Sequence, residues 1–258
     1  MKIIVLNDNQ PGDVCGAAHG LSFWVEADIT FLFDTGPSDI FLQNARLLGI
    51  NPDLAPVVVL SHGHYDHTGG LPFLQGKKLV CHPAALEPKF RKADRRLMGI
   101  PLTPSEIAQR FEQVTSVSPL QLSPEVFFLG EIPRENDFES KSTPFVNADG
   151  SDDFVPDDSG VAVATHRGLV VVSGCAHSGI CNLVEHARRV TGIKKVHAVA
   201  GGFHLKEENG VTLRTIHYFR AIGVERVLPS HCTTGPALEA FRRHWPSESI
   251  RSGGVLRF

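Results

Sequence analysis

The chain contains 258 residues, 42% of them hydrophobic and 21% charged, which is the composition of an ordinary globular protein. This balance excludes an intrinsically disordered chain and a collagen-like repeat. The formal net charge is −3, so the chain as a whole does not attract nucleic acid or an anionic membrane, and any binding of anions must be local.

The N-terminal segment and the cysteines indicate the cellular compartment. Only four apolar residues, Ile3–Leu6, precede the polar Asn7, and such a segment is too short for a secretory signal. No stretch approaches the roughly 20 apolar residues that cross a bilayer. The five cysteines form an odd set without a C-x-x-C pair, which argues against a disulfide framework. We therefore expect a cytoplasmic protein with reduced thiols.

The first third of the chain is rich in short β segments bounded by Gly, Pro, Asp or Asn. We expect a helix over residues 38–48, capped by Ser38 or Asp39 and ended by Gly49. The continuous apolar run Pro56–Leu60 predicts a strand that is covered on both faces. The other strands expected in this region are residues 2–6, 22–26, 30–33 and 78–81.

Two segments interrupt this pattern. Residues 84–117 carry a run of basic residues and several prolines, and we expect an inserted lid with a helix over residues 105–111. Residues 134–158 are polar and lack periodicity, so we expect a long loop. Calcium binding is the alternative for this loop, but its aspartates do not have the EF-hand spacing. The aspartates in question are Asp149, Asp152, Asp153, Asp157 and Asp158.

The second half of the chain alternates strands and helices. The expected strands are residues 161–164, 169–172, 196–200, 226–228 and 254–258, and the expected helices are residues 182–191, 213–222 and 237–244. We find no short internal repeat. This order fits two β-rich layers with helices outside them, so we expect one α/β domain over residues 1–258.

The strongest chemical signal is the segment Ser61–His67, S-H-G-H-Y-D-H, at the end of a buried strand. Side chains alternate in an extended segment, so His62 and His64 project to the same side and can bind one ion. Asp66 and His67 follow a turn and can hold a second ion nearby. The plain alternative is that these histidines only cap backbone groups. Three histidines and an aspartate in so short a segment favour a metal site.

This segment matches the pattern H-x-H-x-D-H, and nearly the whole chain resembles the metallo-β-lactamase superfamily. The resemblance implies a four-layer αβ/βα sandwich. It extends to F-D-T-G around Asp34, which in the family braces the metal loop, and to G-C-A-H-S-G and P-S-H-C, whose histidines are ligands in the family. The implied ligands are His62, His64 and His177 for one ion, and Asp66, His67 and His231 for the other.

The chain departs from the family at one position. Many dinuclear members have an aspartate between the last two histidine motifs that bridges the metals, whereas this chain has no aspartate after Asp158. The matching segment, Ala200–Leu205, offers His204 instead. Either His204 completes the metal site, or the second ion lacks the carboxylate bridge and binds more weakly. We favour a substrate-facing His204 that acts as an acid or hydrogen-bond donor.

Together these motifs resemble the branch named for ribofuranosylaminobenzene 5′-phosphate (dihydropterin) synthase, although a fold does not fix a reaction. We expect a metal-dependent hydrolase of a small phosphorylated or ester substrate, in which two divalent ions activate water and Asp66 accepts its proton. Zinc is the expected metal, with manganese, iron and nickel as alternatives. Two other functions stay open: a transferase that joins a dihydropterin to ribofuranosylaminobenzene 5′-phosphate, and a metal-binding protein without turnover. We expect no nucleic-acid or membrane partner, and the oligomeric state does not follow from the sequence.

Other features of the chain have alternative interpretations. The basic cluster of the expected lid either holds a substrate phosphate or is a solvated helix face. Cys175 and Cys232 suggest nucleophilic catalysis, but buried cysteines commonly pack as small hydrophobic residues, so we expect no thiol catalysis. Di-iron redox chemistry is disfavoured because His64 stands where the oxygen-reducing relatives have Glu. The members of the basic cluster are Lys89, Arg91, Lys92, Arg95 and Arg96.

Overall fold

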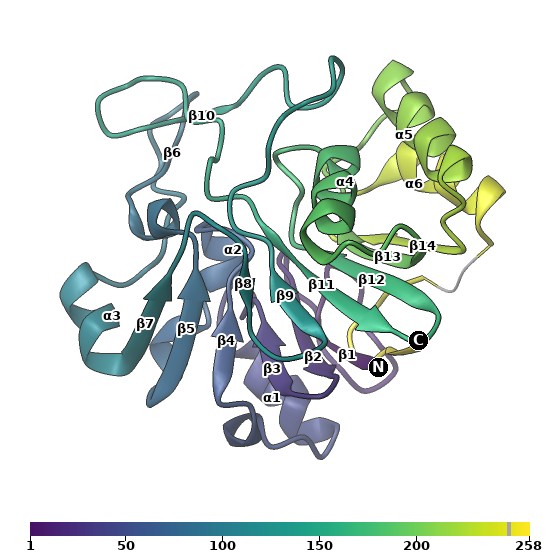
Figure 1. The fold of residues 1–258 in the computed structure, drawn as a ribbon. Coiled ribbons are helices and arrows are strands. Elements are labelled where there is room, and N and C mark those ends of the chain that lie inside the picture. Colours follow the sequence, from purple (N-terminus) through teal and green to yellow (C-terminus); the bar gives the residue numbers. More distant parts are fainter. Residues whose placement is uncertain (247–248) are drawn as a thin grey trace.

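The structure, a computed structural model, describes residues 1–246 and 249–258 of the chain (Figure 1). Within these residues two large β-sheets face each other. The larger sheet has the strand order β15 (Val255–Arg257), β1 (Lys2–Asn7), β2 (Ser22–Glu26), β3 (Thr30–Phe33), β4 (Val57–Val59), β5 (Lys77–Cys81) and β7 (Phe111–Thr115). The second sheet has the order β14 (Arg226–Ser230), β13 (Val196–Gly202), β12 (Gly168–Ser173), β11 (Gly160–Thr165), β9 (Val126–Phe128) and β8 (Leu120–Gln121).

Helices cover the outer face of each large sheet, and a small ribbon of two strands lies apart from both (Figure 1). The ribbon pairs β6 (Phe90–Arg91) with β10 (Phe145–Val146). The α-helices are α1 (Ile40–Leu47), α2 (Tyr65–Thr68), α3 (Pro104–Arg110), α4 (Ile180–Thr191), α5 (Gly210–Ala221) and α6 (Gly235–His244). Three short 3₁₀ turns are η1 (Pro52–Leu54), η2 (Leu71–Phe73) and η3 (Pro83–Leu86).

The alternation of side chains along each strand produces the layers. In β3, Phe31 and Phe33 enter the core between the two sheets, while Leu32 points outward and packs in the cluster that contains α1. In β12, Val170 and Val172 face the same central core. The side chains of β12 that alternate with them face the cluster beneath α4, α5 and α6. Both faces of these strands are therefore buried, and the expected four-layer sandwich is confirmed.

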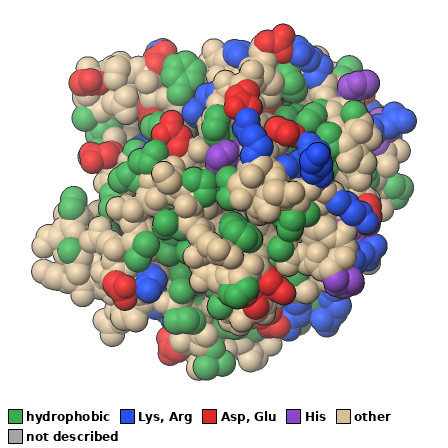
Figure 2. Space-filling view, viewed as in Figure 1, with side chains coloured by type: hydrophobic (Ala, Val, Ile, Leu, Met, Phe, Trp, Pro, Cys, Tyr) green, Lys and Arg blue, Asp and Glu red, His purple; other side chains and the backbone are tan. Residues whose placement is uncertain are grey.

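Helix α4 illustrates why the outer layers form. Its buried side chains Ile180, Leu183, Val184 and Ala187 recur at intervals of three and four residues, which places them on one face of the helix. The helix ends at Gly192, whose positive φ of 71° is the left-handed conformation that glycine adopts without strain. Figure 2 shows acidic and basic side chains interspersed over the surface, in keeping with the small net charge.

Six strands end at the same edge of the molecule. Strands β1 and β3 are each antiparallel to β2, and β4 runs parallel to β3, so these three share one direction. In the second sheet β12, β13 and β14 are mutually parallel. Polar residues follow the carboxyl end of each of these strands, and ligands commonly bind at such an edge. Among the described residues, every helix is too short or too polar to cross a membrane.

The structure differs from the sequence expectation at the inserted lid, residues 84–117. Ile107 of α3 is buried in the outer core, and β7 pairs in parallel with β5 at the edge of the larger sheet. The C-terminal part of the expected insertion thus belongs to the sandwich. Its remaining part, residues 87–100, is called the flap below. The flap pairs through β6 with β10, which lies in the polar segment 134–158, called the acidic loop below.

The basic cluster of the flap has a role that neither sequence interpretation included. Lys89 Nζ lies 2.6 Å from Asp157 Oδ1 and 3.5 Å from Asp153 Oδ2, and all three side chains are buried. Lys92 pairs with Asp152 at the surface. Basic residues of the flap therefore bind carboxylates of the acidic loop and hold the two segments together.

The buried contact of Lys89 with Asp157 extends to the segment Ser61–His67, called the metal loop here. Asp157 Oδ2 accepts a hydrogen bond of 2.7 Å from the backbone nitrogen of Gly63, between the two histidines at the end of β4. The ion pair Lys89–Asp157 thus connects the flap to the expected ligand loop. Removing the lysine would leave two buried carboxylates without a cation, which is much more costly than losing an exposed pair.

We predict that Lys89→Met lowers the free energy of unfolding by about 3–5 kcal/mol, the usual cost of breaking a buried ion pair. The matched control is Lys92→Met, which removes an exposed flap–loop pair and should cost less than about 1 kcal/mol. Urea unfolding of both variants, at equal metal content, measures the difference. Equal losses of stability in the two variants would contradict the role given to Lys89.

Candidate metal centre

The expected ligands come together at the edge where the six strands end. His62 and His64 follow β4, and Asp66 and His67 lie on the single turn of α2. The other two, after β12 and β14, face them from the second sheet across a cavity of about 410 Å³. These two are His177 and His231. The structure therefore brings together the six residues that the resemblance implies as ligands.

The first group contains His62, His64 and His177. The Nε2 atom of His62 lies 2.9 Å from Nδ1 of His64, and a ligand atom of His177 lies within 4.8 Å of both. Nε2 of His177 is buried and has no hydrogen-bond partner in the described structure. Three nitrogens that face one another at these distances can surround one cation, because neighbouring ligands of tetrahedral zinc are about 3.3 Å apart.

The second group contains Asp66, His67 and His231. Nε2 of His67 lies 3.1 Å from Nε2 of His231. Oδ2 of Asp66 lies 3.8 Å from the first of these nitrogens and 3.5 Å from the second. One carboxylate oxygen and two imidazole nitrogens thus converge on a point beside the first group.

A buried carboxylate, Asp34, orients the metal loop. It follows β3, and its Oδ1 accepts a hydrogen bond from the backbone nitrogen of Ser61 (2.8 Å). Its Oδ2 accepts from Ser61 Oγ (2.7 Å) and from His67 Nδ1 (2.7 Å). This arrangement confirms that Asp34 braces the metal loop. It also directs Nε2 of His67 into the cavity.

Hydrogen bonds fix the orientation of two more imidazoles. Since Ser61 Oγ donates to Asp34, it accepts from Nδ1 of His62, and Nε2 of His62 keeps its lone pair. Asn9 Oδ1 accepts from Nδ1 of His231 over 3.0 Å, which turns Nε2 of His231 toward the cavity. In both rings the nitrogen that faces the cavity is the one free to bind a cation.

The protonation equilibria fit a cation at both positions. Burial lowers the pKa of His62 and His177 well below the ordinary value, and it lowers the pKa of His64 to about 3. These three rings are neutral and offer lone pairs. For His67 burial acts in the same direction, but Asp34 and Asp66 outweigh it and raise the pKa to about 9. The second group therefore lies in a negative potential that favours positive charge.

Backbone strain concentrates at this edge. Four of the seven described non-glycine residues with positive φ lie here: Asp34 (57°), Ala176 (52°), His204 (54°) and His231 (52°). Such conformations cost free energy and persist where the surrounding structure enforces them, commonly at functional sites. Asp34 and His231 directly follow strands, and Ala176 and His204 lie three and two residues after a strand.

Several supporting residues lie outside the motifs of the sequence. Asn9 is one of them, and it orients His231. Asp8 Oδ2 accepts from the backbone nitrogen of His231 (3.2 Å). Asp158 Oδ2 accepts from the backbone nitrogen of Ser178 (2.9 Å), next to a ligand, and burial raises the pKa of Asp158 to about 6. Their only signal in the sequence is an acidic or amide residue near a strand end.

Comparison with known proteins agrees with this geometry. The family model of the metallo-beta-lactamase superfamily matches residues 16–187. A 7,8-dihydropterin-6-methyl-4-(beta-D-ribofuranosyl)-aminobenzene-5′-phosphate synthase of Methanocaldococcus jannaschii is 34% identical, over 93% of this chain and 90% of its own. An uncharacterized protein of the same organism is 31% identical, over 92% of each chain.

Solved structures give the same result. Tm1679, described as a metal-dependent hydrolase of the beta-lactamase superfamily, superposes with a TM-score of 0.89 at 32% identity, covering 100% of this chain and 99% of that one. A diphosphatase from the PhnP family shares the fold, with a TM-score of 0.58 at 13% identity and coverage of 100% and 97%. The fold and the site define a metal-binding αβ/βα sandwich protein. The chain belongs to the metallo-β-lactamase superfamily, and the expected resemblance is confirmed.

We predict that His62→Ala and His177→Ala each lose the ion of the first group, because two remaining imidazoles hold a divalent ion poorly. His231→Ala should retain that ion and lose the other. Metal analysis after dialysis measures the content, with His217→Ala, an exposed histidine of α5, as the control that keeps the wild-type content. Normal metal content in both His62→Ala and His177→Ala would refute the ligand assignment.

Proposed function

We propose that the protein is a dinuclear metallohydrolase that cleaves a small phosphorylated substrate. The observation that carries this proposal is the pair of adjacent ligand groups. Their facing nitrogens lie 2.9 Å apart in the first group and 3.1 Å apart in the second. The superfamily membership supports hydrolytic chemistry, and the neutral imidazoles of the first group support zinc as the metal. Five free, buried cysteines support a reducing, cytoplasmic setting.

The two groups would hold divalent ions, which would supply Lewis acidity at the scissile bond and lower the pKa of a bound water molecule toward neutral pH. The proton transfers belong to the chain's own residues. Asp66 accepts the proton of the attacking water. Its Oδ2 lies 3.4 Å from Nε2 of His19, which is a neighbouring titratable group. His204 lines the same cavity and donates a proton or hydrogen bond to the leaving group.

The position of His204 supports this role. Its ring centroid lies 4.5 Å from that of His177, and its Nδ1 is buried without a hydrogen-bond partner in the described structure. The preceding Gly201 has a φ of 115°, and a Cβ atom there would lie 2.0 Å from the carbonyl oxygen of Ser173. Only glycine permits this close approach, which brings His204 to the edge of the metal groups.

A second cavity of about 410 Å³ adjoins the metal groups and indicates the substrate class. It shares His177, His204 and Lys206 with the metal cavity, and Lys141 also lines it. Lysine ammonium groups bind phosphate as point charges. We propose that Lys206 holds the substrate's phosphate group, while the rest of the substrate occupies the second cavity.

The flap and the acidic loop complete the pocket in this proposal. Met98 of the flap and Phe145 of the acidic loop line the metal cavity, and the Phe145 ring centroid lies 4.3 Å from that of His64. These apolar side chains exclude bulk water from the reacting groups. We propose that residues 1–258 act as one domain in which the flap is a lid over the site.

A transferase is the second candidate. It is favoured by the synthase from Methanocaldococcus jannaschii, which is 34% identical over 93% of the chain. A ribofuranosylaminobenzene 5′-phosphate also carries a phosphate, so Lys206 would bind either substrate. The two functions differ in whether water or a second organic molecule attacks, and assays separate them.

The test is a screen of the metal-loaded protein against phosphodiesters, phosphomonoesters, thioesters and lactones. We expect hydrolysis of a phosphate ester. Lys206→Met should lower kcat/KM for that substrate about 10- to 100-fold, mainly through KM, because a hydrogen bond to a charged group contributes roughly 1.5–3 kcal/mol. Lys195→Met, which removes an exposed lysine paired with Glu225, is the control and should have no effect.

Several outcomes of the screen would contradict the proposal. Turnover of lactones or thioesters alone would refute the phosphorylated substrate. Condensation of a dihydropterin with ribofuranosylaminobenzene 5′-phosphate, without hydrolysis of any ester, would establish the transferase instead. Full metal loading without turnover of any class would indicate a metal-binding protein.

We predict that His204→Ala retains the wild-type metal content while kcat falls by about 10² to 10⁴, the usual contribution of a positioned proton donor. Metal analysis and steady-state kinetics on the same preparation measure both quantities. Loss of an ion from His204→Ala, with partial recovery of the rate on adding metal, would instead identify His204 as a ligand.

A further inference from the structure

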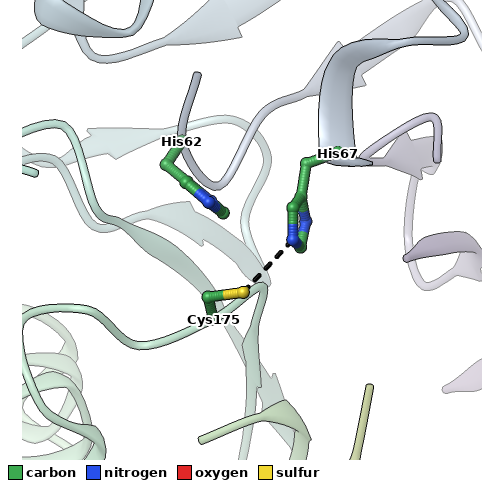
Figure 3. Close-up of side chains that lie close together, drawn as sticks. All are labelled: His62, His67 and Cys175. Atoms are coloured by element: carbon green, nitrogen blue, oxygen red, sulfur yellow. Dashed lines mark hydrogen bonds between the residues drawn. The ribbon is translucent and has the colours of Figure 1, made fainter. Parts of the chain in front are cut away.

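Cys175 lies among the expected ligands, although the ligand pattern from the sequence does not include it. Its Sγ atom is 3.2 Å from Nε2 of His67, the nitrogen that Asp34 directs into the cavity (Figure 3). Figure 3 shows the side chain of Cys175 pointing toward those of His62 and His67, which lie on the segment Ser61–His67. The cysteine side chain is buried, with 3% of its surface exposed.

The sulfur atom is close to ligands of both groups. It lies within 4.8 Å of ligand atoms of His62 and His177, from the first group. It also lies within 4.8 Å of ligand atoms of His67 and His231, from the second group. A single atom this near to both sets of nitrogens is placed to contact an ion in either group.

The backbone on both sides of Cys175 determines the position of its sulfur atom. Gly174 precedes Cys175, and a Cβ atom on this glycine would lie 1.9 Å from Ser61 Oγ and 3.0 Å from Asp34 Oδ2. Glycine therefore lets the turn after β12 pack directly on the metal loop. Ala176, on the other side, has a positive φ of 52°, so a strained turn presents the cysteine between the two sheets.

Charge and donor type also favour a ligand at this place. Among the potential ligand groups of the described residues, Asp66 is the only carboxylate. Two divalent ions held by neutral imidazoles would carry a positive charge that Asp66 and the buried Asp34 behind His67 compensate only in part. A thiol that binds a metal ion loses its proton and contributes a negative charge. Nε2 of His177 is buried and has no hydrogen-bond partner in the described structure, so a nitrogen close to the sulfur is available to a cation.

We propose that Cys175 is a thiolate ligand shared by the two metal ions, an inference that rests on the dinuclear site of the proposed function. The sulfur takes the place between the ligand groups where this chain has no second carboxylate. A thiolate there selects zinc, cobalt or iron over manganese and magnesium, because soft sulfur donors bind the former more tightly.

The other nearby thiol is a natural control. Sγ of Cys232 accepts a hydrogen bond from the backbone nitrogen of His204 (3.2 Å) and lies 3.8 Å from the carbonyl oxygen of Cys175. The same sulfur also lies within 4.8 Å of ligand atoms of Cys175 and His231, so Cys232 is the competing thiol that the comparison must test. Cys232→Ser removes a second buried thiol from the same pocket without removing the proposed ligand.

The experiment compares wild type, Cys175→Ser and Cys232→Ser, each stripped of metal and titrated with two equivalents of Co²⁺. Absorption spectra report thiolate-to-cobalt charge transfer in the near ultraviolet, and metal analysis reports the stoichiometry. We expect the charge-transfer band in wild type and Cys232→Ser and its loss in Cys175→Ser, with the second ion bound at least about tenfold more weakly.

A second measurement needs no variant and so does not depend on whether Cys175→Ser folds. X-ray absorption at the zinc edge of the wild-type protein should contain a sulfur scatterer at about 2.3 Å. A shell of nitrogen and oxygen alone would overturn the proposal.

Each remaining outcome is decisive. Two bound Co²⁺ ions without a charge-transfer band in wild type would overturn the thiolate ligand and leave the dinuclear site intact. A band that disappears in Cys232→Ser and persists in Cys175→Ser would assign the ligand to Cys232 instead. Absence of bound metal in wild type would overturn both this inference and the proposed function.

Discussion

Imidazole nitrogens that face one another in a buried pocket are the constraint on which the rest of the structure depends. His62 and His64 approach to 2.9 Å, and His67 and His231 approach to 3.1 Å. Two lone pairs at such a distance, away from water, are unfavourable unless a proton or a metal ion lies between them. Hydrogen bonds from behind hold His62, His67 and His231 in place, so the protein maintains an arrangement that a proton or a metal ion between the rings stabilises.

The groups that hold the rings explain the surrounding architecture. Because β3 lies beside β4, the single carboxylate of Asp34 can contact both the loop backbone and His67. Because the end of β1 lies beside the end of β14 in the other sheet, Asn9 can contact the ring of His231. Asp157 ties the metal loop to Lys89 of the flap. The sandwich thus brings strand ends that are distant in the sequence to one edge of the molecule. The acidic loop covers part of the site at this edge.

Much of this could be predicted from the sequence, because the relevant signals are local. Apolar runs and glycine-bounded strands indicated the element order, and the H-x-H-x-D-H pattern placed four expected ligands on one loop. The pairing of Lys89 with Asp157 could not be predicted, because it joins residues 68 positions apart through an ion pair that no periodicity marks. The strand β7 was assigned to the insertion, since an edge strand with exposed polar residues resembles a loop. The place of Cys175 depends on the turn formed by Gly174 and Ala176, which only the folded backbone reveals.

The central claim is that two cations lie between these ligands, and an anomalous-difference map from a crystal of the metal-loaded protein tests it most directly. Data collected on both sides of the zinc absorption edge should contain two peaks about 3.5–4 Å apart, the usual separation in two-metal sites. One peak should lie among His62, His64 and His177, and the other among Asp66, His67 and His231. A map without a peak among these residues, from protein shown by metal analysis to contain zinc, would contradict the account.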